Sequence, residues 1–105
     1  MRAPDFAFIQ QSRLPGAVSA PRWVPVMPDL VVEVVSSGDR PAGIADKVTM
    51  WLDAGVRMAL VVTPGARTID VHHPGQPLLT LRDGDTLDGG DVLPGFSAPV
   101  SHLLG

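Results

Sequence analysis

The stretch Pro28-Asp29-Leu30-Val31-Val32-Glu33-Val34-Val35-Ser36 decides how this chain folds. Most of its residues are apolar and its valines are β-branched, so the pattern predicts a strand buried inside a sheet. Two acidic residues, Asp29 and Glu33, interrupt the apolar run. A carboxylate buried without a partner is strongly destabilising. Each acid therefore either lies at a solvated strand end or meets a cation.

The composition predicts one globular domain, residues 1–105, because the chain has 105 residues, of which 45% are hydrophobic and 18% charged. It contains no cysteine, which excludes disulfide scaffolds and thiolate zinc sites and is compatible with the cytoplasm. No apolar run approaches the roughly 20 residues of a membrane helix, so we expect no membrane partner. The net charge of −3 argues against strong DNA binding, because DNA-binding surfaces are usually basic.

Hydrophobic periodicity predicts an α/β (α+β) fold with one main helix. The helix is expected over residues 41–54, with Pro41 in its first turn and Gly55 as its cap. It joins two buried strands, which predicts a parallel, right-handed crossover. Later segments are joined by short turns and predict antiparallel strands, followed by a helix or turn around residues 100–104. The expected strands are residues 5–10, 28–36, 57–63, 67–72, 78–81 and 86–87.

The helix carries an apolar stripe that should pack on the sheet. The stripe consists of Ile44, Val48, Trp51 and Leu52. At about 100° per residue, Lys47 falls at the edge of this stripe, between Trp51 and Ala54. A lysine in that place must either extend to solvent or find a carboxylate.

Spacing limits which acids can share an ion. Residues four apart in one strand, such as Asp29 and Glu33, are separated by about 13 Å and cannot hold the same small cation. Directly paired residues on neighbouring strands have Cβ atoms about 5 Å apart, so Asp5 is the candidate partner of Glu33. Mg²⁺ is commonly held by one or two carboxylates with waters and phosphate.

Lys47 could then activate a metal-bound water or stabilise charge on a phosphoryl centre. From the residues alone, a second interpretation stays open. Lys47 and Glu33 form a structural ion pair in that interpretation, and Asp5 is a solvated strand end.

The opening stretch, followed by Lys47 and residues 54–57 and 61–64, resembles the Uma2 family of putative restriction endonucleases. The segments Pro4-Asp5-Phe6-Ala7-Phe8-Ile9 and Asp85 to Phe96 also match that family, so the resemblance covers almost the whole chain. It implies the restriction-endonuclease-like fold of the PD-(D/E)XK nuclease superfamily, with a mixed sheet flanked by helices.

The resemblance also implies hydrolysis of DNA phosphodiester bonds with Mg²⁺ or Mn²⁺. It assigns Asp5 and Glu33 as metal ligands and Lys47 as a catalytic lysine that has moved onto the helix. Asp29 belongs to the family motif too, but the strand spacing makes it a secondary site residue.

The chain departs from the family pattern in two ways. Family members usually carry a further segment before the first aspartate, so we expect a short or N-terminally truncated member, and a homodimer that covers the exposed sheet. Trp51 stands where the family pattern leads us to expect tyrosine. The alternative function is a non-catalytic nuclease-fold protein that serves as a structural or interaction module.

Overall fold

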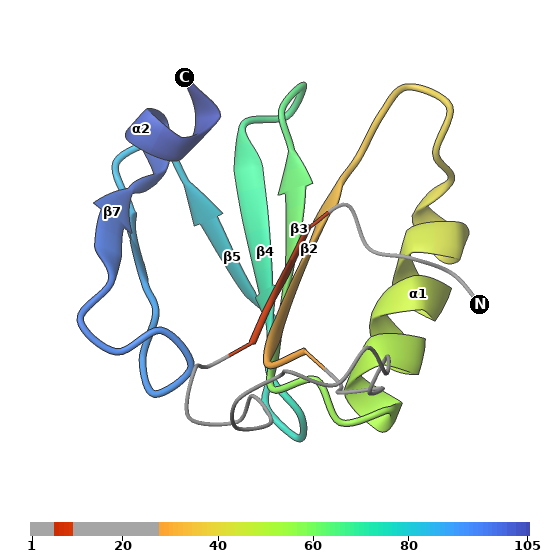
Figure 1. Cartoon of the computed structure of the whole chain (residues 1–105). Helices are drawn as coiled ribbons and strands as arrows, with labels where there is room; N and C mark the ends of the chain where they lie inside the picture. Colours follow the sequence, from red (N-terminus) through yellow and green to blue (C-terminus); the bar gives the residue numbers. More distant parts are fainter. Residues whose placement is uncertain (1–5, 10–27) are drawn as a thin grey trace, which may run out of the picture.

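The computed structural model describes residues 6–9 and 28–105, which form a five-stranded sheet, a two-stranded sheet and two helices. Figure 1 shows the helix α1 on one side of the larger sheet and the smaller sheet with α2 on the other. The elements are β1 (Phe6–Phe8), β2 (Leu30–Val34), α1 (Pro41–Asp53), β3 (Met58–Thr63), β4 (Thr68–His72), β5 (Leu79–Arg82), β6 (Thr86–Asp88), β7 (Ser97–Pro99) and α2 (Val100–Leu104).

The larger sheet has the order β1-β2-β3-β4-β5 and is mixed. Strands β2 and β3 are parallel and are joined through α1, whereas β1 with β2, β3 with β4 and β4 with β5 are antiparallel. The fold class predicted from the sequence is therefore confirmed, including the crossover helix and the antiparallel C-terminal strands. Strand β7 was not predicted, because its three residues follow a loop rich in glycine and proline.

Helix α1 begins and ends as its sequence indicates. Pro41 is its first residue, where a missing N–H costs no hydrogen bond. After Asp53 the chain leaves the helix, and Gly55 adopts a φ of 110°, a conformation that glycine tolerates and other residues avoid. Val48 and Trp51 are the buried residues of the helix, and they face the sheet.

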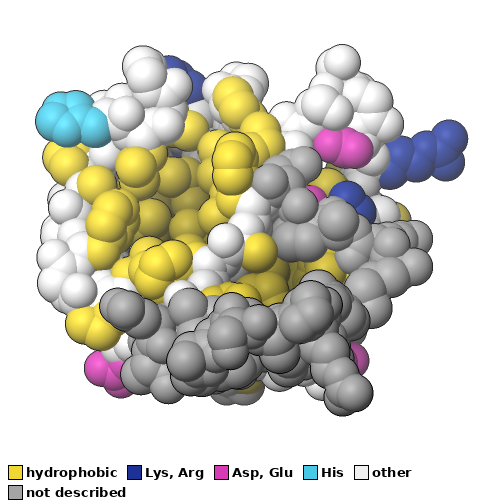
Figure 2. Space-filling view, viewed as in Figure 1, with side chains coloured by type: hydrophobic (Ala, Val, Ile, Leu, Met, Phe, Trp, Pro, Cys, Tyr) yellow, Lys and Arg dark blue, Asp and Glu magenta, His cyan; other side chains and the backbone are white. Residues whose placement is uncertain are grey.

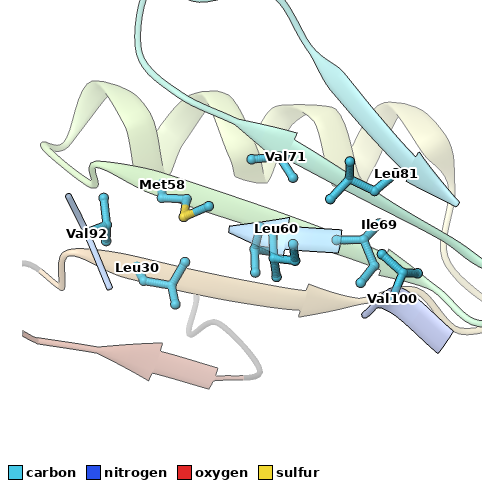
Figure 3. Packing of buried hydrophobic residues seen from close by; sticks show 9 residues of the cluster. Leu30, Met58, Leu60, Ile69, Val71, Leu81, Val92 and Val100 are labelled. Atoms are coloured by element: carbon cyan, nitrogen blue, oxygen red, sulfur yellow. The ribbon is translucent and has the colours of Figure 1, made fainter. Parts of the chain in front are cut away.

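Alternation along β2 divides the core into two clusters, one on each face of the larger sheet. Val31 packs towards α1 with Ala59 and Val61 of β3. Leu30 packs on the opposite face, against residues that reach in from the other strands and from the C-terminal layer (Figure 3). That second cluster consists of Leu30, Met58, Leu60, Ile69, Val71, Leu81, Leu87, Val92 and Val100. Glu33, two residues beyond Val31, is thereby aimed at α1.

An apolar hollow lies between the larger sheet and the C-terminal layer, and Figure 2 shows hydrophobic side chains gathered in a depression on this face. Its volume is about 340 Å³, and its lining includes Phe6, Val34, Phe96 and Leu103. Phe6 remains 65% exposed. Apolar surface of this kind is a common feature of protein interfaces. The homodimer predicted from the sequence stays a prediction, which sedimentation equilibrium can test.

Among the described helices, neither has both the length and the apolar character needed to cross a membrane.

Candidate functional site

Glu33 is a buried acid with two partners on α1. It lies in β2 opposite Val61 of β3 and is only 1% exposed. The indole Nε1 of Trp51 donates a hydrogen bond to Glu33 Oε1 at 3.1 Å. The ammonium Nζ of Lys47 lies 3.4 Å from Glu33 Oε2. The two carboxylate oxygens therefore have different partners, and the acid that interrupts the apolar strand is compensated in its buried position.

Helix geometry explains why both partners reach the same carboxylate. Lys47 and Trp51 are four residues apart, so their side chains emerge on the same side of α1, one turn apart. Trp51 lies within the core below the helix, whereas the Lys47 side chain is 29% exposed. Lys47 thus lies at the margin of the buried stripe. Its aliphatic stem lies along the protein, and its ammonium group contacts the Glu33 carboxylate.

A hollow of about 490 Å³ lies beside this ion pair. It is lined by Phe6, Glu33, Val34, Ser36, Asp39 and Lys47. Two carboxylates and one ammonium therefore border a single space. Those groups suit a ligand that carries both cationic and anionic parts, such as a metal ion with a phosphate.

Asp39 also borders this hollow, although the sequence analysis did not single it out as a site residue. Its Oδ2 accepts hydrogen bonds from the backbone N–H of Ser36 at 2.8 Å and from the Ser36 hydroxyl at 3.1 Å. These hydrogen bonds, the backbone one first, lower the pKa of Asp39, and the charge of Lys47 lowers it further. The Ser-x-x-Asp spacing is typical of a side chain that closes a turn, and it carries no sign of the nearby hollow.

Asp29 lies at the other end of β2 and does not line this hollow. It is fully buried, and the Nη1 atom of Arg57 lies 3.7 Å from its Oδ1. Its carbonyl oxygen also accepts hydrogen bonds from the backbone N–H groups of Arg57 and Met58. Asp29 therefore joins the start of β2 to the start of β3.

Replacing Arg57 with alanine should lower the free energy of unfolding by about 1–2 kcal/mol, because it removes a cation from a buried carboxylate. The loss is smaller than for a fully buried pair, since the Arg57 side chain is 41% exposed. Urea denaturation measures it, and Arg82→Ala, which removes an exposed arginine of β5, is the matched control. Equal losses in both variants would show that the Asp29 pair contributes nothing of its own.

Asp5 lies outside the described residues, so its predicted meeting with Glu33 stays a prediction. Within residues 6–9 and 28–105, no three His, Cys, Asp or Glu side chains are grouped closely enough to hold a metal ion. The part of the site that the structure describes is thus Glu33 with Lys47, Trp51 and Asp39 around it. Asp29 belongs to a separate ion pair.

The mixed sheet, the crossover helix and the acid–lysine pair between them define a restriction-endonuclease-like α/β domain. The chain belongs to the Uma2 family, described as "Putative restriction endonuclease", whose match covers residues 1–101. This confirms the family resemblance seen in the sequence.

A crystal structure of similar fold is known, that of a putative nuclease belonging to DUF820 from Anabaena variabilis ATCC 29413. The TM-score is 0.85 at 17% sequence identity, so the likeness concerns the fold. The match covers 98% of this chain and 59% of that chain, and this chain therefore spans less than two thirds of that protein's length. A search of curated proteins found no match.

Proposed function

We propose that this chain hydrolyses phosphodiester bonds in DNA with the help of Mg²⁺ or Mn²⁺. The observation that carries the proposal is the contact between the buried Glu33 carboxylate and the Lys47 ammonium beside a hollow. Membership of the Uma2 family supports the same chemistry. The formal charge of −3 argues for weak DNA binding, so recognition would depend on the site more than on a basic surface.

In this proposal, the described residues provide part of the site for a hard divalent cation. Glu33 supplies a carboxylate whose Oε2 already faces a positive charge, that of Lys47. Asp39 borders the same hollow with a lowered pKa, so its carboxylate is ionised near neutral pH. Mg²⁺ needs only one or two carboxylates, because waters and substrate phosphate complete its shell. A bound Mg²⁺ would supply a water of lowered pKa and polarise the phosphate.

The second ligand in this proposal is Asp5. Strands β1 and β2 are antiparallel, and Phe6 lies opposite Val32, the residue before Glu33. Asp5 directly precedes Phe6 in the sequence, so of the acids in the chain it is the one closest to the β1 residue that pairs beside Glu33.

Lys47 holds a positive charge at the rim of the hollow, close to where a phosphate beside Glu33 would lie. A cation in that place stabilises the charge that builds on a phosphoryl centre during displacement. Because its side chain is partly exposed, Lys47 can turn from Glu33 towards a substrate without unfolding the helix.

The test is incubation of the purified chain with supercoiled plasmid in MgCl₂ or MnCl₂, followed by gel electrophoresis. We expect conversion to open-circular and linear DNA that stops when EDTA is added. Plasmid cleavage that does not depend on metal, or the absence of cleavage in both MgCl₂ and MnCl₂, would overturn the nuclease proposal. Either result would favour the alternative, a non-catalytic interaction module. The cytoplasmic location stays a prediction.

A further inference from the structure

We propose that a second pocket, between α1 and strands β3 and β4, binds an unstacked nucleobase of the DNA strand that lies at Glu33. The base that it fits best carries an exocyclic amino group, as guanine does. The inference rests on the proposed function and deepens it, because it names single-stranded or locally unpaired DNA as the substrate.

The pocket lies on the face of the larger sheet that carries α1, beside the first half of that helix. Its volume is about 370 Å³, which falls within the range of small-molecule sites. Most of its lining is apolar, and Ile44, Val48 and Val61 are among the side chains that form the walls. Walls of this kind suit a flat, uncharged ring, because its faces are removed from water on binding.

Polar side chains of β4 line one side of the pocket. Asp70 and His72 are two residues apart in that strand, so both project from the face that carries α1. The Thr80 hydroxyl donates a hydrogen bond to Asp70 Oδ1 at 2.7 Å, which orients the carboxylate. Burial lowers the pKa of His72, and the charge of Asp70 offsets part of that effect, so the imidazole is neutral at pH 7.

These groups call for a ligand that donates hydrogen bonds. A carboxylate has two oxygens with about four acceptor positions, so the bond from Thr80 leaves Asp70 able to accept more. Guanine presents its N1–H and amino groups side by side on the Watson–Crick edge, which matches the two oxygens of one carboxylate. Thymine has no exocyclic amino group. Of the described residues that line the pocket, none is Lys or Arg, so the pocket does not suit a phosphate.

The pocket adjoins the hollow beside Glu33 and Lys47, since Asp39 lines both. Within the sheet, Glu33 and Asp70 are both register partners of Val61, one on each side. They are therefore two strand spacings apart, or about 10 Å. That separation is on the scale of one nucleotide, so a nucleotide with its phosphate beside Lys47 lies within reach of the pocket with its base.

A base in this pocket has left its stack. Enzymes that bind a single base in a pocket either extrude it from a duplex, at the cost of unpairing and unstacking, or take it from a single strand at little cost. The net charge of −3 does not favour the capture of duplex DNA through its phosphates. Recognition through a base pocket gives this acidic chain another way to hold a strand, and it favours unpaired DNA.

The first test titrates dGMP and dTMP into the native chain without metal, followed by methyl NMR spectra. The two nucleotides carry the same phosphate, so a difference in affinity reports on the base. We expect dGMP to bind at least about tenfold more tightly, the effect of one hydrogen bond to a charged group. Asp70→Asn should remove this preference, because it replaces an acceptor oxygen with a donor. Asp53→Asn, in an exposed residue of α1 outside the pocket lining, is the matched control.

A second pair of variants blocks the pocket without touching its polar groups. Ala45 lines the pocket from an exposed position on α1, so Ala45→Phe should fill the space while the buried core stays as it is. Ala42 is exposed one turn earlier and does not line the pocket, so Ala42→Phe is the control. We expect dGMP binding to be lost in Ala45→Phe and retained in Ala42→Phe.

The DNA measurement compares one guanine-containing oligonucleotide as a single strand and as a duplex, in MnCl₂. The single strand should be cleaved at least about tenfold faster, because a duplex must first unpair. Equal cleavage of both forms overturns the inference, as does equal affinity for dGMP and dTMP or an equal loss of binding in Ala42→Phe and Ala45→Phe. Plasmid cleavage without any dGMP binding overturns the base pocket alone. Binding of dGMP without cleavage of any DNA overturns the proposed function, and the substrate assignment with it.

Discussion

Glu33→Gln is expected to weaken Mn²⁺ binding by at least about a hundredfold and to abolish plasmid cleavage, since loss of even an outer-shell partner of a metal costs up to that factor. Glutamine has the size of glutamate and retains a carbonyl oxygen that can accept the Trp51 N–H. It lacks the negative charge that a divalent ion needs. The fold should therefore survive while the site loses its main ligand.

Isothermal titration with MnCl₂ measures the first effect and the plasmid assay the second. Asp46→Asn is the matched control, because it removes one negative charge from an exposed residue of α1. The control should bind and cleave as the native chain does. If Glu33→Gln bound Mn²⁺ with native affinity, Glu33 would be a structural acid whose role is to hold Lys47 and Trp51.

The second large effect is expected for Lys47→Met, which should slow DNA cleavage by about 10²–10³-fold, the range for removing one group that stabilises developing charge. Methionine retains an unbranched, flexible stem but removes the ammonium beside Glu33. Affinity for Mn²⁺ should be retained or increase, since the variant no longer holds a cation that competes for Oε2. Cleavage and metal binding should thus separate in this variant.

Arg40→Met is the control for Lys47→Met, because it removes an exposed positive charge just before α1. Cleavage rates are compared at saturating MnCl₂, so that differences in affinity do not contribute. Equal cleavage by native chain and Lys47→Met would identify the Lys47–Glu33 contact as a structural ion pair. That result would agree with the interpretation that the sequence left open.

The fold was predictable because its main signals are local. The valine-rich strand, the apolar stripe on the helix and the glycine after it each report on a few neighbouring residues. Together they lead to the parallel β2–α1–β3 unit. Helical geometry alone also placed Lys47 at the edge of the buried stripe, where the structure has it in contact with Glu33.

The rest of the site depends on contacts between distant residues, which local patterns do not contain. The Trp51 indole bonds to a carboxylate 18 residues earlier in the chain, and only the packing of α1 on β2 brings them together. Asp39 reads as a turn residue because its hydrogen bonds are local, and its place beside the hollow follows from where the turn lies on the sheet. Strand β7 is found only through its pairing with β6.

Lys47, whose amine contacts Glu33, is the single lysine of the sequence. Reductive methylation with ¹³C-formaldehyde would therefore label this side chain and the amino terminus alone. Two resonances of such a sample are enough to follow Lys47 directly as metal ions or oligonucleotides are added.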